Sequence, residues 1–370
     1  MSMKKIFTIF VVVLCGIAVW VGTFYYKNLR GVGPATSPPQ EIAVNTTDLP
    51  LIIPPGFSIS IFAKDLVNPR VLAFDPQGKL LVSIPSQGKV VALPEKTTVV
   101  DGLYRPHGLA FHDGKLYVAE TDGVSVNKKK ILDLPSGGNH FSRSIGFGPD
   151  GRLYITVGSS CNVCVEKDWR RAKMLVANAD GSDLKEYATG LRNSVFFVWH
   201  PVTKKLWATD MGRDLIGDNM PPEEVNIVEE GEDYGWPYCY ASRVHDDNFD
   251  PKKTKSCANT TAPHITFQAH SAPLGLAFIP DSWPSEYRGD LLVAYHGSWN
   301  RTEPTGYKVV RFDLDENGNS KGEIDFLSGF LESPSADGAI GRPVDLLFDM
   351  EGNLYISDDK AGVVYRVIKQ

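Results

Sequence analysis

SIGFGPDGRLYIT, residues 144–156, combines an apolar strand, a Pro-Asp-Gly turn and a second strand in which apolar and polar residues alternate. This pattern is typical of a β-hairpin. It recurs along the chain at residues 71–83, 108–120, 197–209, 275–295 and 345–357. An aromatic residue marks the first strand of each hairpin: Phe74, Phe111, Phe147, Trp199, Phe278 and Phe348.

Six hairpins at this spacing predict an all-β fold, a six-bladed β-propeller. The segments GFSISIFA (56–63) and GVVYRVI (362–368) come from opposite ends of the hairpin series. We expect them to share one blade and close the ring. A β-sandwich is the competing interpretation, but it does not explain a hairpin that is repeated six times.

The region before the hairpins has a different composition. Residues 6–26 carry no charge, and this uncharged stretch is long enough for a membrane-spanning helix. We therefore assign residues 1–30 to a signal anchor or transmembrane segment. No good cleavage site follows, which favours an uncleaved anchor over a cleaved signal peptide. Residues 31–53 are rich in Pro, Thr and Ser and are expected to be a linker to the propeller at 54–370. Either form of export places the propeller on the extracytoplasmic (periplasmic or extracellular) side.

Charge and cysteine content narrow the class of protein. The net charge of −6 and the lack of a basic block argue against nucleic-acid binding. Outside the apolar segment there are four cysteines, an even number that suits two disulfides in an oxidising compartment. We expect the pairs Cys161–Cys164 and Cys239–Cys257. The CNVC motif is not followed by His, so it is not a haem attachment site.

A basic residue lies shortly before the marker aromatic residue of each hairpin, in approximately the same register. These residues are Arg70, Arg105, His107, His140, Arg143, Arg192, His270 and Arg342. Around one propeller axis they would form a dense cationic mouth, which predicts a ligand with several carboxylates or phosphates. The alternative is that each arginine caps a loop carbonyl or pairs with a neighbouring Asp.

Several motifs together resemble one known family. They are NHFSRSIGFGPDGRLYITVG, TGLRNSVFFVWHPVTKKLWATDMG, EEVNIVEEGEDYGWP, LLVAYHGSWNR and GRPVDLLFD. The chain from about residue 54 to its end resembles the glucose/sorbosone dehydrogenase family, whose members are six-bladed propellers that use pyrroloquinoline quinone and calcium. HGSWNR and GSSCNVC look closer to the sorbosone dehydrogenase-like branch.

The resemblance implies roles for individual residues. His140 matches the catalytic histidine, which would act as general base. Arg192 would bind and polarise the quinone oxygens beside Asn193. Arg301 stands where a cofactor lysine is expected, and Arg342 matches a cofactor arginine. The implied cofactor-binding set is therefore Arg192, Asn193, Arg301 and Arg342, joined by Arg70 and Arg143 of the cationic mouth.

The resemblance also implies calcium. The backbone carbonyls of Gly212 and Arg213 match the site that bridges protein and quinone. Glu224 and Tyr234 match a second, structural calcium site of some members. The chain departs from the family pattern at Val195, where other members have Gln, and in MGRD, where some have Gly-Pro.

The implied function is oxidation of an aldose or sugar aldehyde with hydride transfer to pyrroloquinoline quinone. Electrons would pass to an external acceptor, a quinone or cytochrome, because the chain has no haem motif. One alternative is a lactonase-like propeller, which would need acidic and Asn side chains on the axis where this chain has basic ones. The other is a non-catalytic propeller that binds an anionic ligand there.

Overall fold

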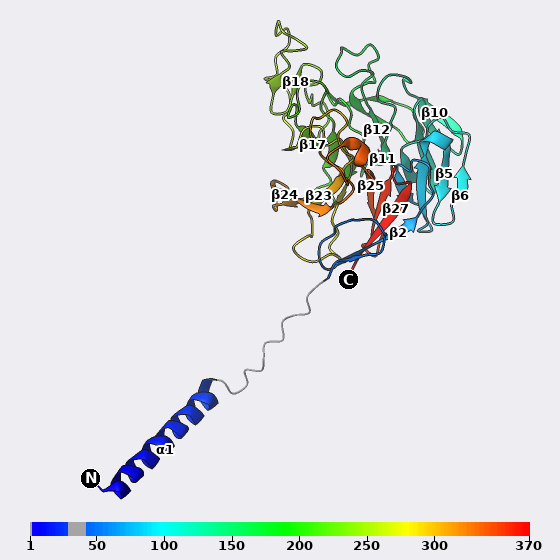
Figure 1. Cartoon of the computed structure of the whole chain (residues 1–370). Helices are drawn as coiled ribbons and strands as arrows, with labels where there is room; N and C mark the ends of the chain where they lie inside the picture. Colours follow the sequence, from blue (N-terminus) through cyan, green and yellow to red (C-terminus); the bar gives the residue numbers. More distant parts are fainter. Residues whose placement is uncertain (1, 29–41) are drawn as a thin grey trace. The chain divides into compact units, whose positions relative to one another are not determined.

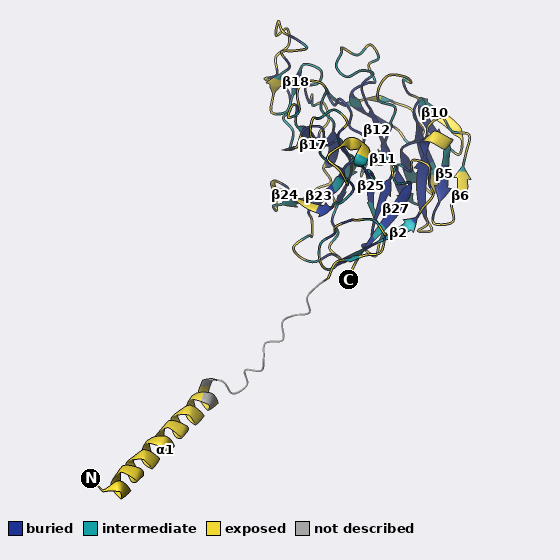
Figure 2. Cartoon of the chain, viewed as in Figure 1, coloured by how far each residue is buried: buried dark blue, intermediate teal, exposed yellow. Residues whose placement is uncertain are grey.

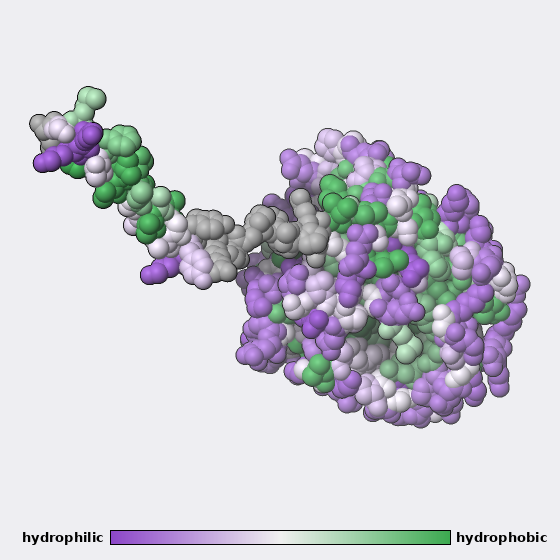
Figure 3. Space-filling model, turned by 90° about the horizontal axis from the view of Figure 1, so that it is seen from below, coloured by the Kyte–Doolittle hydropathy of each residue, from purple (hydrophilic) through white to green (hydrophobic). Residues whose placement is uncertain are grey.

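The computed structural model describes residues 2–28 and 42–370 of the chain. The chain divides into two compact units, Met1–Glu41 and Ile42–Gln370. The described part of the first unit is the helix α1 (Met3–Asn28), whose apolar side chains are exposed (Figures 2 and 3). Residues Met3–Phe24 are long and apolar enough to cross a membrane, and a signal sequence meets the same criteria. The structure therefore confirms an apolar N-terminal helix.

The second unit is a six-bladed propeller (Figure 1). The first three blades are continuous in sequence. Blade one contains β3 (Leu72–Phe74), β4 (Leu80–Ile84), β5 (Lys89–Ala92) and β6 (Thr97–Val100), with a short 3-10 turn at Pro85–Gln87. Blade two contains β7 (Leu109–His112), β8 (Lys115–Glu120), β9 (Gly123–Val126) and β10 (Lys129–Asp133). Blade three contains β11 (Ile145–Phe147), β12 (Leu153–Val157), β13 (Lys173–Ala177) and β14 (Lys185–Thr189).

The remaining blades contain an insertion and the closure of the ring. Blade four contains β15 (Phe197–Trp199), β16 (Leu206–Asp210), β17 (Glu223–Val228) and β20 (Ile265–Phe267). A two-stranded hairpin, β18 (Cys239–Tyr240) and β19 (Val244–His245), lies between β17 and β20. Blade five contains β21 (Pro273–Phe278), β22 (Leu291–Tyr295), β23 (Lys308–Leu314) and β24 (Ser320–Leu327). A 3-10 turn at Ala336–Gly338 precedes blade six.

Blade six joins the two ends of the propeller. It contains β25 (Pro343–Phe348), β26 (Leu354–Asp358), β27 (Val363–Lys369), β2 (Phe57–Ala63) and β1 (Val44–Asn45). Strand β2 pairs antiparallel with β27, from Phe57 opposite Lys369 to Ala63 opposite Val364. This confirms the expectation that 56–63 and 362–368 share a blade.

The folded unit begins earlier than the sequence boundary at residue 54. Strand β1 pairs parallel with β2, and Ile52 forms a bridge with Ser328. Residues 42–53, expected in the linker at 31–53, are therefore part of the propeller unit. They are held by backbone pairing, which the Pro- and Thr-rich composition of the segment did not indicate. Residues 31–41 of the expected linker lie outside the described residues.

In five of the six hairpins the repeated aromatic residue packs against an aromatic ring of the preceding blade. Phe147 of blade three lies 4.8 Å from the Tyr117 ring of blade two, and Trp199 of blade four lies 5.3 Å from the Tyr154 ring of blade three. The same cross-blade contact joins Phe278 to Trp207, Phe348 to Trp283, and Phe74 to Tyr355, at 5.3, 5.3 and 5.6 Å. Edge-to-face contacts of this kind stabilise a pair beyond the area that they bury.

Both faces of the second strand in a blade are covered by neighbouring blades. All residues of β4, β12, β16, β22 and β26 are buried (Figure 2). This explains why these strands contain runs such as LLVSI and LLVAY instead of strict alternation.

The ring closure gives a stability prediction. Phe57 on β2 is 1% exposed, and its ring lies 4.6 Å from that of Trp283 and 5.5 Å from that of Phe326. Phe57→Ala should lower the free energy of unfolding by about 3–5 kcal/mol, because it leaves a cavity where blade six is completed. The control is Ser60→Ala on the same strand, which should change it by less than about 1 kcal/mol. Denaturant unfolding of both variants tests this, and equal losses would contradict it.

Candidate active site

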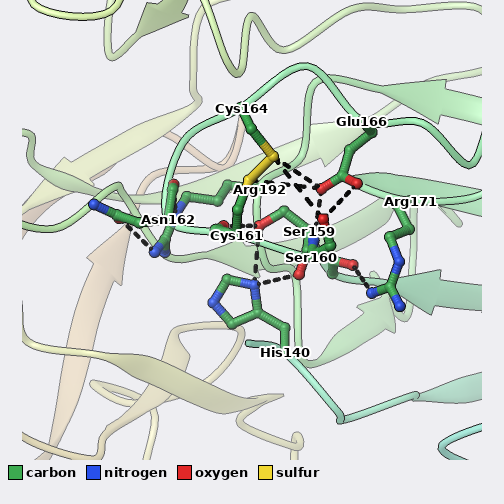
Figure 4. The surroundings of a disulfide bond; sticks show 10 residues. His140, Ser159, Ser160, Cys161, Asn162, Cys164, Glu166, Arg171 and Arg192 are labelled. Carbon is green, nitrogen blue, oxygen red and sulfur yellow. Dashed lines mark hydrogen bonds between the residues drawn. A yellow bond between two sulfur atoms is a disulfide. The ribbon is translucent and has the colours of Figure 1, made fainter. Parts of the chain in front are cut away.

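His140 lies in the loop between β10 and β11, against the loop that connects β12 and β13. Its Nδ1 is 2.9 Å from the carbonyl oxygen of Ser159 and 3.0 Å from the Ser159 hydroxyl (Figure 4). A carbonyl only accepts hydrogen bonds, so Nδ1 carries the proton and Nε2 keeps its lone pair. Within residues 42–370, no protein group forms a hydrogen bond with Nε2. His140 is therefore oriented as a proton acceptor.

The surroundings of His140 keep its imidazole neutral. Burial first, and then the positive charges of Arg192 and Arg143, lower the pKa of His140 to about 3, against the opposing hydrogen bond to Ser159. Burial and like charge both disfavour the imidazolium form. The lone pair on Nε2 is thus available throughout the neutral pH range.

Arg192 and Asn193 enter blade four directly after β14. The Asp210 carboxylate, at the end of β16, accepts from the backbone N–H of Arg192 at 3.0 Å and of Asn193 at 2.7 Å. A Cβ at Gly158 would lie 2.5 Å from Asn193 Oδ1 and 2.8 Å from His140 Cβ. Gly158 thus lets the Asn193 amide and His140 approach each other, as the sequence predicts for two residues of one site.

The Arg192 guanidinium is fully engaged by protein acceptors. Its Nε donates to the Asn162 carbonyl at 2.9 Å, and Nη1 donates to the carbonyls of Met211 and Gly212 at 3.2 and 2.8 Å. Its Nη2 donates to Asn162 Oδ1 and to Asp214 Oδ2, both at 3.0 Å. All five N–H groups are used, so in this geometry Arg192 acts on a guest through its charge and not through a free donor.

Arg143 and Arg70, assigned to the cationic mouth, also have partners in the protein. Arg143 is fully buried, and its Nη atoms donate to three backbone carbonyls of the loop 135–142 at 2.8 to 3.0 Å. Arg70 forms an ion pair with Asp359, with 2.6 Å between Nη1 and Oδ2. The crowding of like charges is therefore relieved inside the protein, as the alternative interpretation of these arginines expected.

Arg342 and Arg301 hold neighbouring loops. Arg342 Nε donates to the His296 carbonyl at 2.9 Å, and its guanidinium carbon lies 5.4 Å from the centre of the Tyr307 ring. Arg301 donates to the carbonyls of Glu303, at 3.0 Å, and Asp218. Neither shares a hydrogen-bond partner with His140 or Asn193 among the described residues.

The residues expected to bind calcium surround one small cavity. Gly212, Arg213, Glu224 and Tyr234 all line a space of about 20 Å³ beside Arg192 and Asp210, which is large enough for one water-sized guest. Burial raises the pKa of Glu224 to about 8, with the nearby Asp210 charge as a further cause. A bound divalent cation would offset the free-energy cost of burying the carboxyl groups of Asp210 and Glu224.

Two of these residues have side chains that are already committed. The Tyr234 hydroxyl donates to the Ile227 carbonyl at 2.6 Å, so only the backbone of Tyr234 is free to contribute a ligand. The Arg213 guanidinium pairs with Asp246 at 2.6 Å. The Arg213 side chain is therefore committed, and its carbonyl is the group that remains for the expected calcium role.

The sequence analysis missed several residues that shape the site. Asp210 anchors the backbone of Arg192 and Asn193, whereas Asp214 and Asn162 bind the Arg192 side chain. His296 Nε2 lies 2.9 Å from Asp359, the partner of Arg70. The only sequence signals were their positions in the segments TDMGRD, SSCNVC and HGSWNR, which do not indicate hydrogen-bond partners.

His140 and His245 have surroundings that shift their pKa values in opposite directions, which predicts different titration behaviour. His140 should remain neutral from pH 8 to pH 4, with its proton on Nδ1, because its pKa lies near 3. His245, whose pKa is raised first by its hydrogen bond to Asp247, should titrate above the usual histidine range. Imidazole ¹⁵N NMR across this pH range measures both. Protonation of His140 near pH 6.5 would contradict the assignment.

Burial of neutral His140 also makes the free energy of unfolding depend on pH. Its pKa in the folded state lies below that of the unfolded chain, so the stabilisation is present above the unfolded pKa. It is lost progressively as the pH falls from about 6.5 towards 3, where the unfolded chain binds a proton that the folded state does not.

Known proteins share this fold and sequence pattern. A model of the TrAA12-like family matches residues 51–370. A protein of Borreliella burgdorferi is 30% identical over 358 residues, which cover 88% of this chain and 93% of that protein. The pyrroloquinoline quinone-dependent sugar dehydrogenase of Hypocrea jecorina is 26% identical over 392 residues, covering 84% of this chain and 87% of its own.

The pyrroloquinoline quinone-dependent pyranose dehydrogenase of Coprinopsis cinerea is 23% identical over 402 residues, covering 85% of this chain and about half, 54%, of that protein. The holo structure of its PQQ domain matches 89% of this chain and 100% of that domain with a TM-score of 0.72 and 21% identity, which shows a common fold. Because the family model spans nearly all of the folded unit, the chain belongs to the TrAA12-like family.

Proposed function

We propose that this protein is a quinoprotein oxidoreductase that oxidises an aldose or sugar aldehyde and passes the electrons to an external acceptor. The observation that carries the proposal is His140, a neutral imidazole whose Nδ1–H is bound to Ser159 and whose Nε2 has no hydrogen-bond partner among the described residues of the propeller unit. The family membership and the dehydrogenase relatives support the reaction class.

The residues around His140 fit a polar cofactor. The structure describes several buried polar atoms near the loops at this end of the propeller that have no hydrogen-bond partner: Arg70 Nε, His107 Nε2, Arg143 Nε, Arg213 Nε and Asn300 Oδ1. Such atoms cost free energy until a guest or water binds them. The three arginine Nε atoms are donors for carboxylates, which suits pyrroloquinoline quinone. Asn300 Oδ1 is an acceptor, and so is His107 Nε2, because His107 Nδ1 carries the proton that faces the Arg143 carbonyl.

The cofactor-binding set follows from this fit. Asn193 has an amide whose Nδ2 contacts only the Met211 sulfur, at 3.4 Å, a weak acceptor that an oxygen of the guest would readily replace. Arg70 and Arg143 each retain an unpartnered Nε–H. Arg301 and Arg342 are the remaining members of the proposed set. They would act indirectly, because each donates hydrogen bonds to carbonyls of the neighbouring loops. When bound, pyrroloquinoline quinone supplies the two-electron acceptor of the reaction.

His140 and Arg192 would have different roles in the reaction. His140 Nε2 takes the proton from the substrate hydroxyl, and Nδ1 stays bound to Ser159, so the ring keeps its orientation as it becomes charged. The Arg192 charge opposes protonation of His140 in the resting state. The same charge stabilises negative charge that develops nearby during oxidation.

Calcium would bind in the cavity lined by Asp210, Gly212, Arg213, Glu224 and Tyr234. The donor set consists of carboxylate and carbonyl oxygens, which calcium prefers. Glu224 accepts one hydrogen bond on each oxygen, from Ala241 N–H at 2.9 Å and from the Asn226 amide at 3.2 Å, and retains lone pairs for a cation. At this position calcium would fix the loop that carries Gly212 and compensate the buried carboxyl groups.

The disulfides support export of the propeller. Cys161–Cys164 and Cys239–Cys257 are both present in the structure, as the sequence predicts. Disulfides persist in oxidising compartments. With helix α1 acting as a membrane anchor, the propeller would function on the extracytoplasmic side, where a membrane quinone or a cytochrome would serve as acceptor.

Replacement of His140 tests the function. His140→Ala should bind pyrroloquinoline quinone as tightly as the wild type but lose turnover of aldoses by a factor on the order of 10² to 10⁴, because the proton acceptor is missing. His245→Ala, at a partly buried histidine on the insertion between β17 and β20, is the control and should retain turnover. Calorimetric titration and an artificial-acceptor assay measure both quantities. Undiminished turnover in His140→Ala would exclude the base assignment, and a wild type that does not bind the cofactor would exclude the quinoprotein function.

Glu224 gives a second test, of the metal site. Calcium should raise the thermal midpoint of the wild-type protein, because a ligand that binds only the folded state stabilises it. Glu224→Gln should remove most of this rise. Glu229→Gln, at an exposed carboxylate in the same region, should retain it. Equal calcium responses in all three proteins would show that the cavity does not bind calcium.

A further inference from the structure

The loop between β12 and β13 contacts both functional residues of the candidate site (Figure 4). Ser159 binds His140 through its carbonyl and hydroxyl, and its hydroxyl donates to the Cys161 carbonyl at 2.6 Å. Asn162, directly after Cys161, binds Arg192. Within eight residues, Gly158–Val165, the chain therefore holds the proton acceptor on one side and the adjacent positive charge on the other.

Asn162 uses its backbone and both ends of its amide. Its carbonyl accepts from Arg192 Nε at 2.9 Å, and its Oδ1 accepts from Arg192 Nη2 at 3.0 Å. The same Oδ1 accepts from the Asp214 backbone N–H at 2.8 Å, and Nδ2 donates to the Asp214 carbonyl at 3.0 Å. Asn162 thus fixes the Arg192 side chain and the loop after β16 at once, although Asp214 is 52 residues away in sequence.

The Cys161–Cys164 disulfide encloses Asn162 in a small ring. The bond links residues three positions apart, so it restricts the backbone directly on both sides of Asn162. Both cysteines of this pair are only half-buried, whereas Cys239 and Cys257 of the other disulfide are 5% and 8% exposed. A reductant in solution therefore reaches the first bond more easily than the second.

The rest of the loop is fastened by other contacts. Glu166 accepts from the Ser160 hydroxyl at 2.8 Å and from its backbone N–H at 2.5 Å. These bonds do not involve the sulfur atoms, so we expect reduction to free the tip that carries Asn162 and to leave the base of the loop in place. Cys161, Cys164 and Glu166 lie close enough for a metal, but as a disulfide the two sulfurs are not thiolate ligands.

We propose that Asn162 is a positioning residue for Arg192 and Asp214, and that the Cys161–Cys164 disulfide holds it there as a reversible redox control of the site. The effect on activity rests on the proposed function, whereas the effect on Asn162 does not. A dithiol reductant cleaves the S–S bond and donates two electrons and two protons. The protein gains two S–H groups, and the reductant becomes a cyclic disulfide.

The Asp214 amide proton reports on this arrangement without any cofactor, because its acceptor is Asn162 Oδ1. Hydrogen exchange at Asp214 should become on the order of tenfold faster in Asn162→Ala and in Cys161→Ser/Cys164→Ser, since each loses about one hydrogen bond. Val165→Ala, an exposed residue just outside the disulfide ring, is the matched control and should leave this rate unchanged. An Asp214 exchange rate that is unaffected by loss of the disulfide would overturn the proposal.

A double-mutant comparison separates a redox control from general loosening. If the disulfide acts through Asn162, Asn162→Ala should have little further effect on Asp214 exchange in the Cys161→Ser/Cys164→Ser background. Fully additive effects would mean that the two features act independently, which would also overturn the proposal. The same variants should weaken cofactor affinity in parallel. A failure confined to cofactor binding would count against the proposed function and not against the role of Asn162.

Chemical reduction of the unmodified full-length protein provides the measurement that does not depend on a mutant folding. Limited dithiothreitol followed by alkylation and peptide mass analysis should label Cys161 and Cys164 well before Cys239 and Cys257. Asp214 exchange should rise as these two labels appear and fall again after reoxidation. Simultaneous labelling of all four cysteines, or labelling of Cys161 and Cys164 with no change at Asp214, would contradict the proposal.

Discussion

Packing between neighbouring blades is the constraint on which the rest of this structure depends. A blade is a small twisted sheet that cannot bury both of its faces alone. The repeated aromatic residue solves this by contacting the preceding blade, as Phe147 does with Tyr117 and Trp199 with Tyr154. Strand β2 then completes blade six, which removes the free edge that an open series of blades would leave. The loops that enter the blades are thereby gathered at one end of the ring.

The candidate site is built from those loops, and buried carboxylates at the ends of second strands hold them. Asp210 binds the backbone N–H of Arg192, Asp358 binds that of Arg342 at 2.9 Å, and Glu120 binds that of Tyr104 at 2.6 Å. Burial raises the pKa of both Asp210 and Asp358 to about 6, so the backbone donors only partly offset the cost of desolvation. A rigid strand end thus fixes the loop of its own blade.

The electrostatics of the site follow from the same arrangement. The arginines are charged, but carbonyls and carboxylates of the loops take up most of their donors. Burial, together with the positive charge of Arg192, keeps His140 neutral. Among the described residues, the Nε–H groups of Arg70 and Arg143 remain unpaired. One set of residues therefore orders the loops and sets the protonation state of His140, which makes loop geometry and the basicity of His140 interdependent.

The sequence by itself determined the propeller, the pairing of its ends and both disulfides, because these depend on the periodicity of strands and on cysteines that are near in sequence. It also identified His140 and Asn193, which the structure brings together across Gly158. It left open whether the arginines bind internal acceptors or a ligand, and it did not indicate that residues 42–53 join blade six. Contacts such as Asn162 with Asp214 join loops of different blades, and only the closed ring decides which of these loops meet. A polar side chain in a loop has many potential partners along the chain, and the tertiary structure selects among them by distance and burial.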